Sequence, residues 1–238
     1  MPIPSSLNPL GTVVKRYPTE GLILDLDYRY SGEGLGENQN SNMGTRGLWA
    51  DISGSGNHAQ IIGAAYTAES GWNGGLATDG AHCYGQVAEA SLTEGDFTLF
   101  LKFYHNVNDL PVGNGRPFFK GSGSDTFALN LNRSGNYMNV DIAGSPSGLI
   151  AGLPTAGIIS VAFTVNRAGR KIIGYLDGLK KMELNANTNF ADYKYTGNMR
   201  LGTQTPTNTS YKGIFKNVLL YNRVLGAAEI TKIQEVLG

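Results

Sequence analysis

The 238-residue sequence has one cysteine, three histidines and no excess of charge of either sign, with 19 basic and 19 acidic residues. A lone cysteine excludes an internal disulfide and a cysteine-based zinc site, so we expect Cys83 to be a small buried hydrophobe. Proteins that bind nucleic acid or anionic membranes usually carry a basic excess or a basic cluster. The balanced charge therefore predicts no nucleic-acid partner and no binding to a membrane surface.

The sequence also lacks the short motifs of common enzyme classes. It contains no Gly-x-Ser-x-Gly, no phosphate-binding glycine-rich loop, no Gly-x-Gly-x-x-Gly and no His-Glu-x-x-His. His58, His82 and His105 lie far apart in the sequence, and none has a spacing typical of metal ligands. These absences predict a protein that is not an enzyme.

No stretch has the character of a secretory signal or a membrane span. The first ten residues lack both a basic region and an apolar region, which predicts that the chain does not use the general secretory route. Residues 142–166 are uncharged, but they contain Pro146 and Pro154 and they alternate in hydrophobicity. We therefore expect turns and strands there, and no membrane insertion.

Glycine, in contrast, is abundant, with 33 residues, about twice the usual share of ~7%. The glycines separate short runs that alternate between apolar and polar residues, most clearly from Phe97 to Tyr104 and in a hairpin over residues 158–178. Only residues 227–237, after Gly226 as N-cap, have the apolar spacing of a helix. The sequence thus predicts an all-β fold, a two-sheet antiparallel sandwich with a short C-terminal helix.

The proline-rich residues 1–20 are predicted to form an extended N-terminal arm, and residues 21–238 a single domain. We expect the arm to pack on its own domain or on a neighbouring subunit. In the first strand, Leu22, Leu24, Leu26 and Tyr28 should share the inner face. Further strands are expected around residues 118–119, 127–131, 138–142, 199–202 and 213–221, with loops at 108–117 and 185–198.

Several motifs follow one another along residues 21–238. They are Asp51-x-Ser-Gly-x-Gly-Asn57, Asp79-Gly80, Asp96-Phe97-Thr98, Tyr175-Leu-Asp-Gly178 and Gly213-x-Phe-x-Asn-Val-x-Leu-Tyr-Asn-Arg-x-Leu-x-x-x-Glu-Ile230. Together they resemble the laminin-G-like and pentraxin-like jelly-roll modules of the concanavalin A-like lectin/glucanase superfamily. The resemblance implies a non-enzymatic domain that binds glycans, proteins or cell surfaces, often with a structural calcium ion.

Glycoside hydrolases also occur on this fold, with a Glu-x-Asp-x-x-Glu motif on one strand. The nearest match here starts at Glu94 and Asp96, but the last acid is replaced by Leu99, which belongs to the hydrophobic face of its strand. Such a hydrolase needs two carboxylates as acid and nucleophile. A hydrolase with a degenerate site is therefore the weakest of the functional hypotheses.

A calcium site is predicted around residues 51–57. Asp51, Ser53 and Ser55 alternate and Asn57 follows, as in the first half of a calcium loop, while Asp25 and Asp27 are the carboxylates that would complete the shell. The alternative is a turn in which these side chains bind their own backbone.

A glycan site is predicted at Trp72, with Asn73 and Tyr66, because a loop tryptophan beside an amide can stack on a sugar ring. The alternative is that Trp72 anchors its loop to the sandwich.

Two functional hypotheses follow from these observations. In the first, the chain is a structural or adhesive protein of a larger assembly, most concretely a bacteriophage virion component such as a decoration, fibre or tail-associated protein. Its arm would bind capsid, tail or identical subunits, and the jelly roll would face a glycan or a cell surface. In the second, it is a free-standing bacterial carbohydrate-binding module, with an extracellular or cell-surface location if a leader was removed.

Overall fold

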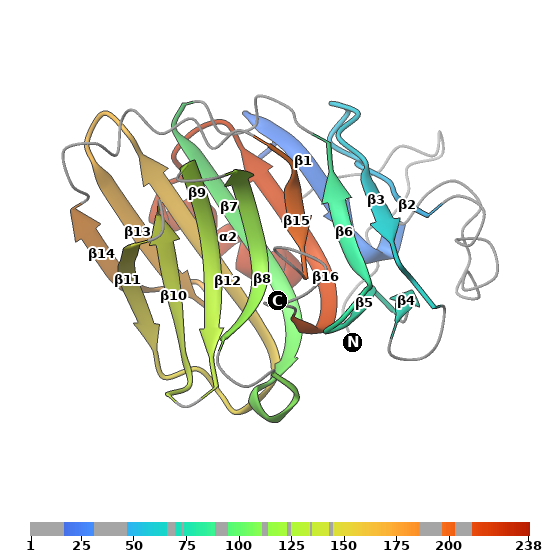
Figure 1. The fold of residues 1–238 in the computed structure, drawn as a ribbon. Helices are drawn as coiled ribbons and strands as arrows, with labels where there is room; N and C mark the ends of the chain where they lie inside the picture. The colour runs from blue at the N-terminus through green and yellow to red at the C-terminus, as the bar shows by residue number, and fades with distance from the viewer. Residues whose placement is uncertain are drawn as a thin grey trace.

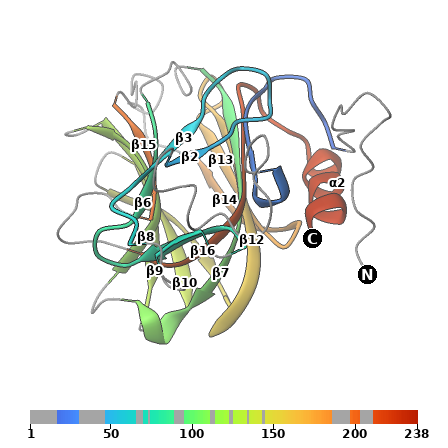
Figure 2. The same cartoon turned by 90° about the vertical axis from the view of Figure 1, so that its right-hand side faces the viewer.

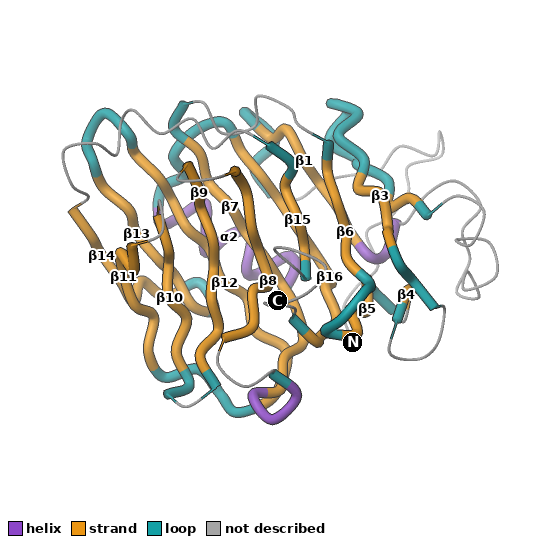
Figure 3. The backbone as a smooth tube through the Cα atoms, in the orientation of Figure 1, coloured by secondary structure: helices purple, strands orange, loops and turns teal. Residues whose placement is uncertain are grey.

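The computed structural model describes residues 17–30, 47–65, 70–72, 74–88, 95–110, 114–122, 125–133, 135–142, 145–185, 197–202 and 211–238. Within these ranges the chain forms two eight-stranded sheets that lie face to face, and every strand pairing is antiparallel (Figure 1). Strands make up most of the described backbone (Figure 3). The predicted antiparallel sandwich is confirmed.

The front sheet, which faces the viewer in Figure 1, has the order β11-β10-β9-β8-β15-β6-β3-β2. Its strands are β11 (Ser145–Ala151), β10 (Tyr137–Ile142), β9 (Asp125–Asn132), β8 (Asn114–Ser122), β15 (Met199–Leu201), β6 (Tyr84–Val87), β3 (Ala59–Ile62) and β2 (Leu48–Trp49).

The back sheet has the order β14-β13-β12-β7-β16-β5-β4, and β1 also pairs with β16. Its strands are β14 (Leu179–Asn185), β13 (Lys171–Leu176), β12 (Ala156–Asn166), β7 (Phe97–Asn106), β16 (Lys212–Tyr221), β5 (Leu76–Asp79), β4 (Gly71–Trp72) and β1 (Leu22–Asp27). Two short 3-10 helices, η1 (Tyr28–Tyr30) and η2 (Val107–Asp109), follow β1 and β7.

The inner faces of the two sheets share one hydrophobic core. Alternate residues of β7, namely Phe97, Leu99, Leu101 and Phe103, are fully buried in it, as the period-two pattern predicts. Cys83 is buried in the same core, and its thiol donates to the carbonyl of Ala77.

The outer face of the back sheet is covered in part by α2 (Ala227–Leu237), which packs on it as Figure 2 shows. Ile230, Ile233 and Leu237 of α2 are buried against Phe100 and Tyr221 of the sheet. Gly226 is the N-cap, as predicted, and its N–H donates to the Glu229 carboxylate. The helix therefore forms because its apolar stripe has a sheet to bury against.

The last residues of the predicted arm pack on their own domain. Tyr17 is buried beside α2, and its hydroxyl donates to the Asp25 carboxylate at 2.7 Å. The carbonyl of Pro18 accepts from the Tyr221 hydroxyl, and that of Glu20 accepts from Arg223. Residues 1–16 lie outside the described residues, so the partner predicted for the arm stays a prediction.

Some local expectations were wrong. Leu22 faces α2 instead of the core, because the pairing of β1 with β16 shifts between Leu22 and Leu24, and Tyr28 begins η1 instead of extending the strand. The loop expected at 108–117 ends early, because β8 starts at Asn114, and strands β11 and β14 were not predicted. None of the described helices is both long enough and apolar enough to cross a membrane.

Candidate functional site

Trp72 lies on β4 and its side chain is only 6% exposed. Its ring meets that of Trp49, which lies on β2 of the other sheet, edge to face with centroids 5.4 Å apart. A sugar-stacking platform needs an open ring face, so this placement corrects the predicted role and matches the anchoring alternative. Asn73 and Tyr66 lie outside the described residues.

The Asp51 carboxylate accepts four hydrogen bonds from other groups of the protein. Its Oδ1 accepts from the backbone N–H groups of Asp25 and Ser53, both at 2.8 Å, and its Oδ2 accepts from the Ser53 hydroxyl at 2.8 Å and from the N–H of Asn57 at 2.9 Å. The Asn57 amide donates in turn to the carbonyl of Ile23. Ser55 is exposed, and only its backbone N–H takes part, donating to Ser53. The segment is thus a turn that Asp51 joins to β1.

The two other predicted calcium ligands point elsewhere. Asp25 accepts from Tyr17, and Asp27 forms a bidentate pair with Arg29. Among the described residues there is no group of three or more His, Cys, Asp or Glu side chains that could hold a metal ion. N–H and O–H donors aimed at a carboxylate occupy the lone pairs that calcium would need, so the turn alternative fits this geometry better, and calcium binding stays a prediction.

A different candidate site lies on the outer face of the front sheet, which α2 does not cover. Alternation along the strands sends hydrogen-bonding side chains outward there, while Leu129, Leu131, Val140 and Ile142 face the core. This polar face consists of Gln60, Tyr84, Gln86, Arg116, Asn130, Tyr137, Asn139, Asp141 and Arg200.

Strand register aligns four residues of the polar face in one row across six adjacent strands. The row runs Gln60, Gln86, Arg200, Phe119, Ala128, Asp141, each residue paired with the next. Phe119 and Ala128 in its middle are buried, whereas Gln60 at one end is exposed. Asn130 and Asn139 are paired with each other two positions further along their strands.

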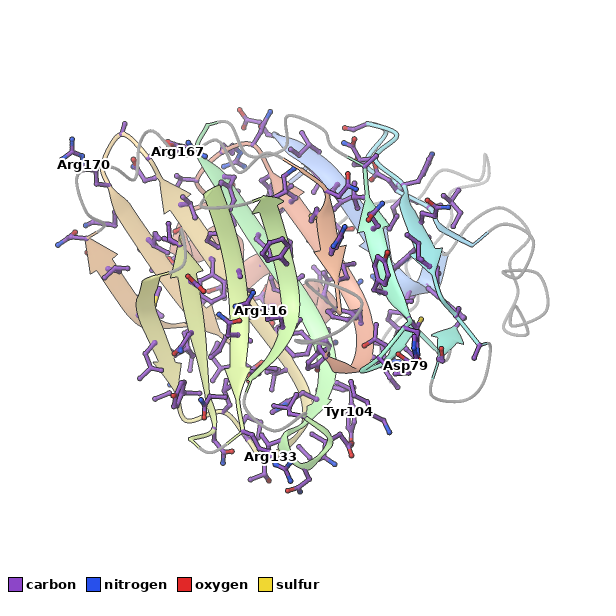
Figure 4. The ribbon with its side chains drawn as sticks, in the orientation of Figure 1. Asp79, Tyr104, Arg116, Arg133, Arg167 and Arg170 are labelled. Carbon is purple, nitrogen blue, oxygen red and sulfur yellow. The ribbon has the colours of Figure 1, made fainter. Side chains whose placement is uncertain are left out.

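Arg116, labelled on the front sheet in Figure 4, is the centre of one polar cluster. Its Nε donates to Oδ1 of Asn130 at 2.5 Å, and its Nη2 lies 3.9 Å from Oδ2 of Asp141. Burial lowers the pKa of Arg116 and the Asp141 carboxylate opposes that shift. The other carboxylate oxygen of Asp141 is buried without a hydrogen-bond partner in the described structure. An acceptor in this state favours a ligand that brings a donor.

A second cluster surrounds Arg200. Its guanidinium lies 5.8 Å from the ring centroid of Tyr84 and its Nε is 3.3 Å from the Gln86 amide oxygen. Stacked and hydrogen-bonded on one side, the guanidinium is held in a fixed orientation on the face. The motif search missed both clusters, since their members come from strands far apart in the sequence. In the sequence, the only indication of these clusters is that polar residues alternate with apolar ones, as Asn130, Asn139 and Asp141 do.

Comparison with known proteins identifies the family. A laminin G family model, described as the concanavalin A-like lectin/glucanases superfamily, matches residues 79–231. The chain belongs to this family. The resemblance inferred from the motifs is therefore confirmed, and the laminin G match covers most of both sheets and the start of α2.

Solved structures agree with the laminin G fold. Trypanosoma rangeli sialidase, in complex with a difluorinated nononic acid, is similar with a TM-score of 0.68 at 18% identity, over 92% of this chain and 33% of the sialidase. The receptor-binding domain of botulinum neurotoxin C/D mosaic serotype gives a TM-score of 0.64 at 12% identity, over 92% of this chain and 52% of that one. The chain thus spans about a third of the sialidase it matches. At these identities the likeness shows the fold alone, and no curated protein matches the chain.

Proposed function

We propose that the chain is a non-enzymatic glycan-binding domain that takes saccharides on the polar face of its front sheet. The observation that carries the proposal is the Asp141 carboxylate oxygen, buried and without a described partner, in a row of amide and guanidinium groups. A saccharide offers many hydroxyl groups, each of which can donate and accept. The face supplies acceptors at Asp141 and Asn139 and donors at Arg116 and Arg200 in fixed register.

Aromatic side chains support the same ligand class. Tyr84 and Tyr137 are partly exposed on the polar face, at opposite sides of Arg116 along the sheet order. A tyrosine ring offers an apolar surface to the C–H face of a sugar while its hydroxyl stays available for hydrogen bonding. The sialidase and the toxin receptor-binding domain have the same fold, and glycan binding fits this resemblance by analogy only.

Lack of catalysis is part of the proposal. Leu99 stands where the hydrolase motif needs its last acid, and it is buried in the core. Asp96 is engaged by the backbone N–H of Arg167 at 2.7 Å, so it is not positioned as a free acid. Leu99 and Asp96 therefore do not provide the pair of carboxylates, one acid and one nucleophile, that such a hydrolase needs.

The test is a glycan array followed by titration of the strongest ligand against variants of the polar face. Asn139→Ala and Asp141→Asn should each weaken binding by about tenfold, because each removes one or two hydrogen bonds to the ligand, one of them charge-assisted. Asn108→Ala is the matched control, since Asn108 is an exposed asparagine on η2 and not on the polar face. An array with no ligand, or equal affinity in all three variants, would refute glycan binding at this face.

The virion role suggested by the sequence is a second proposal, which concerns the arm instead of the polar face. If residues 1–16 attach the domain to a phage particle, a chain that starts at Tyr17 should fold with unchanged melting temperature but fail to join particles. The contacts of Tyr17 and Pro18 with the domain are kept in that truncation, which separates attachment from folding. Normal incorporation of the truncated chain would contradict the attachment role.

A further inference from the structure

The outer face of the back sheet, on which α2 packs, carries a second group of polar side chains. Lys102 on β7 is paired in register with Asn217 on β16, and Asn217 is paired with Asp27 on β1. These residues form a row that leads from η1 to the end of α2, where the Lys102 ammonium donates to the carbonyl of Leu237. The row lies on the opposite side of the molecule from the polar face.

A β-bulge brings a second lysine to this row. The register of β16 with β7 shifts between Phe215 and Asn217, so Lys216 is an extra residue without a partner on β7. Phe215 faces the core, and the bulge turns Lys216 outward, where its ammonium lies 4.8 Å from the ring centroid of Tyr28 on η1. Bulges commonly redirect a side chain in this way next to a functional site.

Neither lysine has an ion-pair partner among the described residues. The Lys216 ammonium donates to the carbonyl of Gly74, and both lysines are partly buried. Burial lowers the pKa of both, and for Lys102 the positive charges of Arg29 and Lys216 lower it further. Two partly desolvated positive charges with only carbonyl oxygens as acceptors are costly to hold together without a counter-ion.

The nearby carboxylates are already in use. Asp27 accepts hydrogen bonds from Arg29 on both carboxylate oxygens, and Asp177 accepts from the N–H and the hydroxyl of Ser160. Around Lys102, the positive charges are those of Lys102 itself, Lys216 and Arg29. The negative charges are the Asp27 and Asp177 carboxylates, so one positive charge is in excess.

Asn217 adds a donor to the same place. Its side chain is 1% exposed, and its amide nitrogen Nδ2 is buried with no hydrogen-bond partner in the described structure. A buried amide that donates to nothing is rare, since it loses its bonds to water without replacing them. Capping of α2 explains the position of Lys102, but it explains neither Lys216 nor this unused donor.

We propose that Lys102, Lys216 and Asn217 form a binding site for one oxyanion group, a carboxylate, sulfate or phosphate. Such a group accepts several hydrogen bonds at once and neutralises the excess charge. Tyr104 follows Lys102 by two residues on β7, so it lies on the same face, and it is paired with Ile158 on the neighbouring strand β12. The two side chains are 36% and 54% exposed. That apolar surface can take the organic part of an anionic ligand, so the anion can be free or carried by a larger molecule.

The test uses inorganic sulfate and glucuronate as probes, with chloride and glucose as their controls at matched ionic strength. Binding is followed through the side-chain amide resonance of Asn217, which reports on the site itself, and by calorimetric titration. Both anions should shift this resonance in a saturable way, while chloride and glucose should not. If glucuronate binds more tightly than sulfate, the anion is carried by an organic ligand; if sulfate binds more tightly, it is a free ion.

Variants separate the site from general salt effects. Lys102→Met and Lys216→Met should each weaken sulfate binding by about tenfold, because each removes a charge-assisted hydrogen bond. Both should still fold, since each removes a partly buried charge without an ionic partner. Lys181→Met, at an exposed position of β14, is the matched control and should bind sulfate normally. An Asn217 resonance that responds to neither anion, or an equal response in all three variants, would overturn the proposal.

Discussion

Replacing Asp51 by alanine is expected to lower the free energy of unfolding by about 3 kcal/mol, because hydrogen bonds to a charged group are strong and the buried N–H of Asp25 is left unsatisfied. The carboxylate accepts four hydrogen bonds, one of them from the backbone of Asp25 in the first strand of the back sheet. Its loss therefore removes one link between the turn and β1, while the bond from the Asn57 amide to the Ile23 carbonyl remains. Urea unfolding followed by the fluorescence of buried Trp49 and Trp72 measures the change.

Ser55→Ala is the control for this change. The exposed Ser55 side chain belongs to the same turn but makes no described hydrogen bond, so the free energy of unfolding of this variant should equal that of the parent. The same experiment addresses calcium. We expect neither a chelator nor added calcium to move the melting temperature, since protein donors fill the Asp51 oxygens. A calcium-dependent rise that Asp51→Asn removes would establish the ion site instead. A stability loss in Ser55→Ala as large as in Asp51→Ala would contradict the turn.

The fold was predictable where burial alone decides the local structure. The strand from Phe97 to Phe103 sits between two covered faces, so its alternation is strong and its position in the core follows directly. The helix from Ala227 to Leu237 was predicted for the same reason, since one stripe of it is apolar and meets Phe100 and Tyr221. In both segments, local pattern and tertiary packing favour the same structure.

Bulges and edge strands were not predictable from hydrophobic pattern. The pairing shift between Leu22 and Leu24 reverses the face of Leu22, and the bulge at Lys216 does the same on β16. A bulge depends on the neighbouring strand, which a local pattern does not contain. The edge strand β14 has mostly exposed side chains, so its sequence lacks the apolar period of a core strand.

The candidate sites were the least predictable part. Trp72 was selected as a loop tryptophan beside an amide, but the residue that it packs against, Trp49, lies in a different sheet. Conversely, the polar face joins Gln86 and Arg200 to Asp141 through the register of strands that are distant in the sequence. Side chains on such a face become a set only when the strand order is known, and the same holds for Lys102 and Asn217 on the back sheet.

Acidification is expected to destabilise the protein through His105. This residue of β7 is fully buried beside Phe103, and neither ring nitrogen makes a hydrogen bond with good geometry. Burial lowers the pKa of His105, and the nearby Pro154 carbonyl opposes the shift only in part. The folded protein thus keeps His105 neutral at a pH where the unfolded chain, with a pKa of about 6.5, already binds a proton.

The sign follows from the protons bound in each state. Above pH ~7.5 both states hold a neutral His105, and as the pH falls through ~6.5 the unfolded state alone gains a proton. The free energy of unfolding should therefore fall with decreasing pH by at most about 1.4 kcal/mol per unit from this residue, until the lowered folded-state pKa is reached. Urea unfolding at pH 7.5, 6 and 5 measures this slope.

Two replacements isolate the contribution of His105 from that of the carboxylates. His105→Phe and His105→Leu should be as stable as the parent at pH 7.5, because no well-formed hydrogen bond is lost, and less sensitive to acid between pH 7 and 5. Testing both separates the titration from overpacking by the larger ring. His82→Gln is the control for replacing a histidine that is mostly exposed. If both His105 variants retained the parental slope, the acid sensitivity would belong to other groups and His105 would be charged in the folded protein.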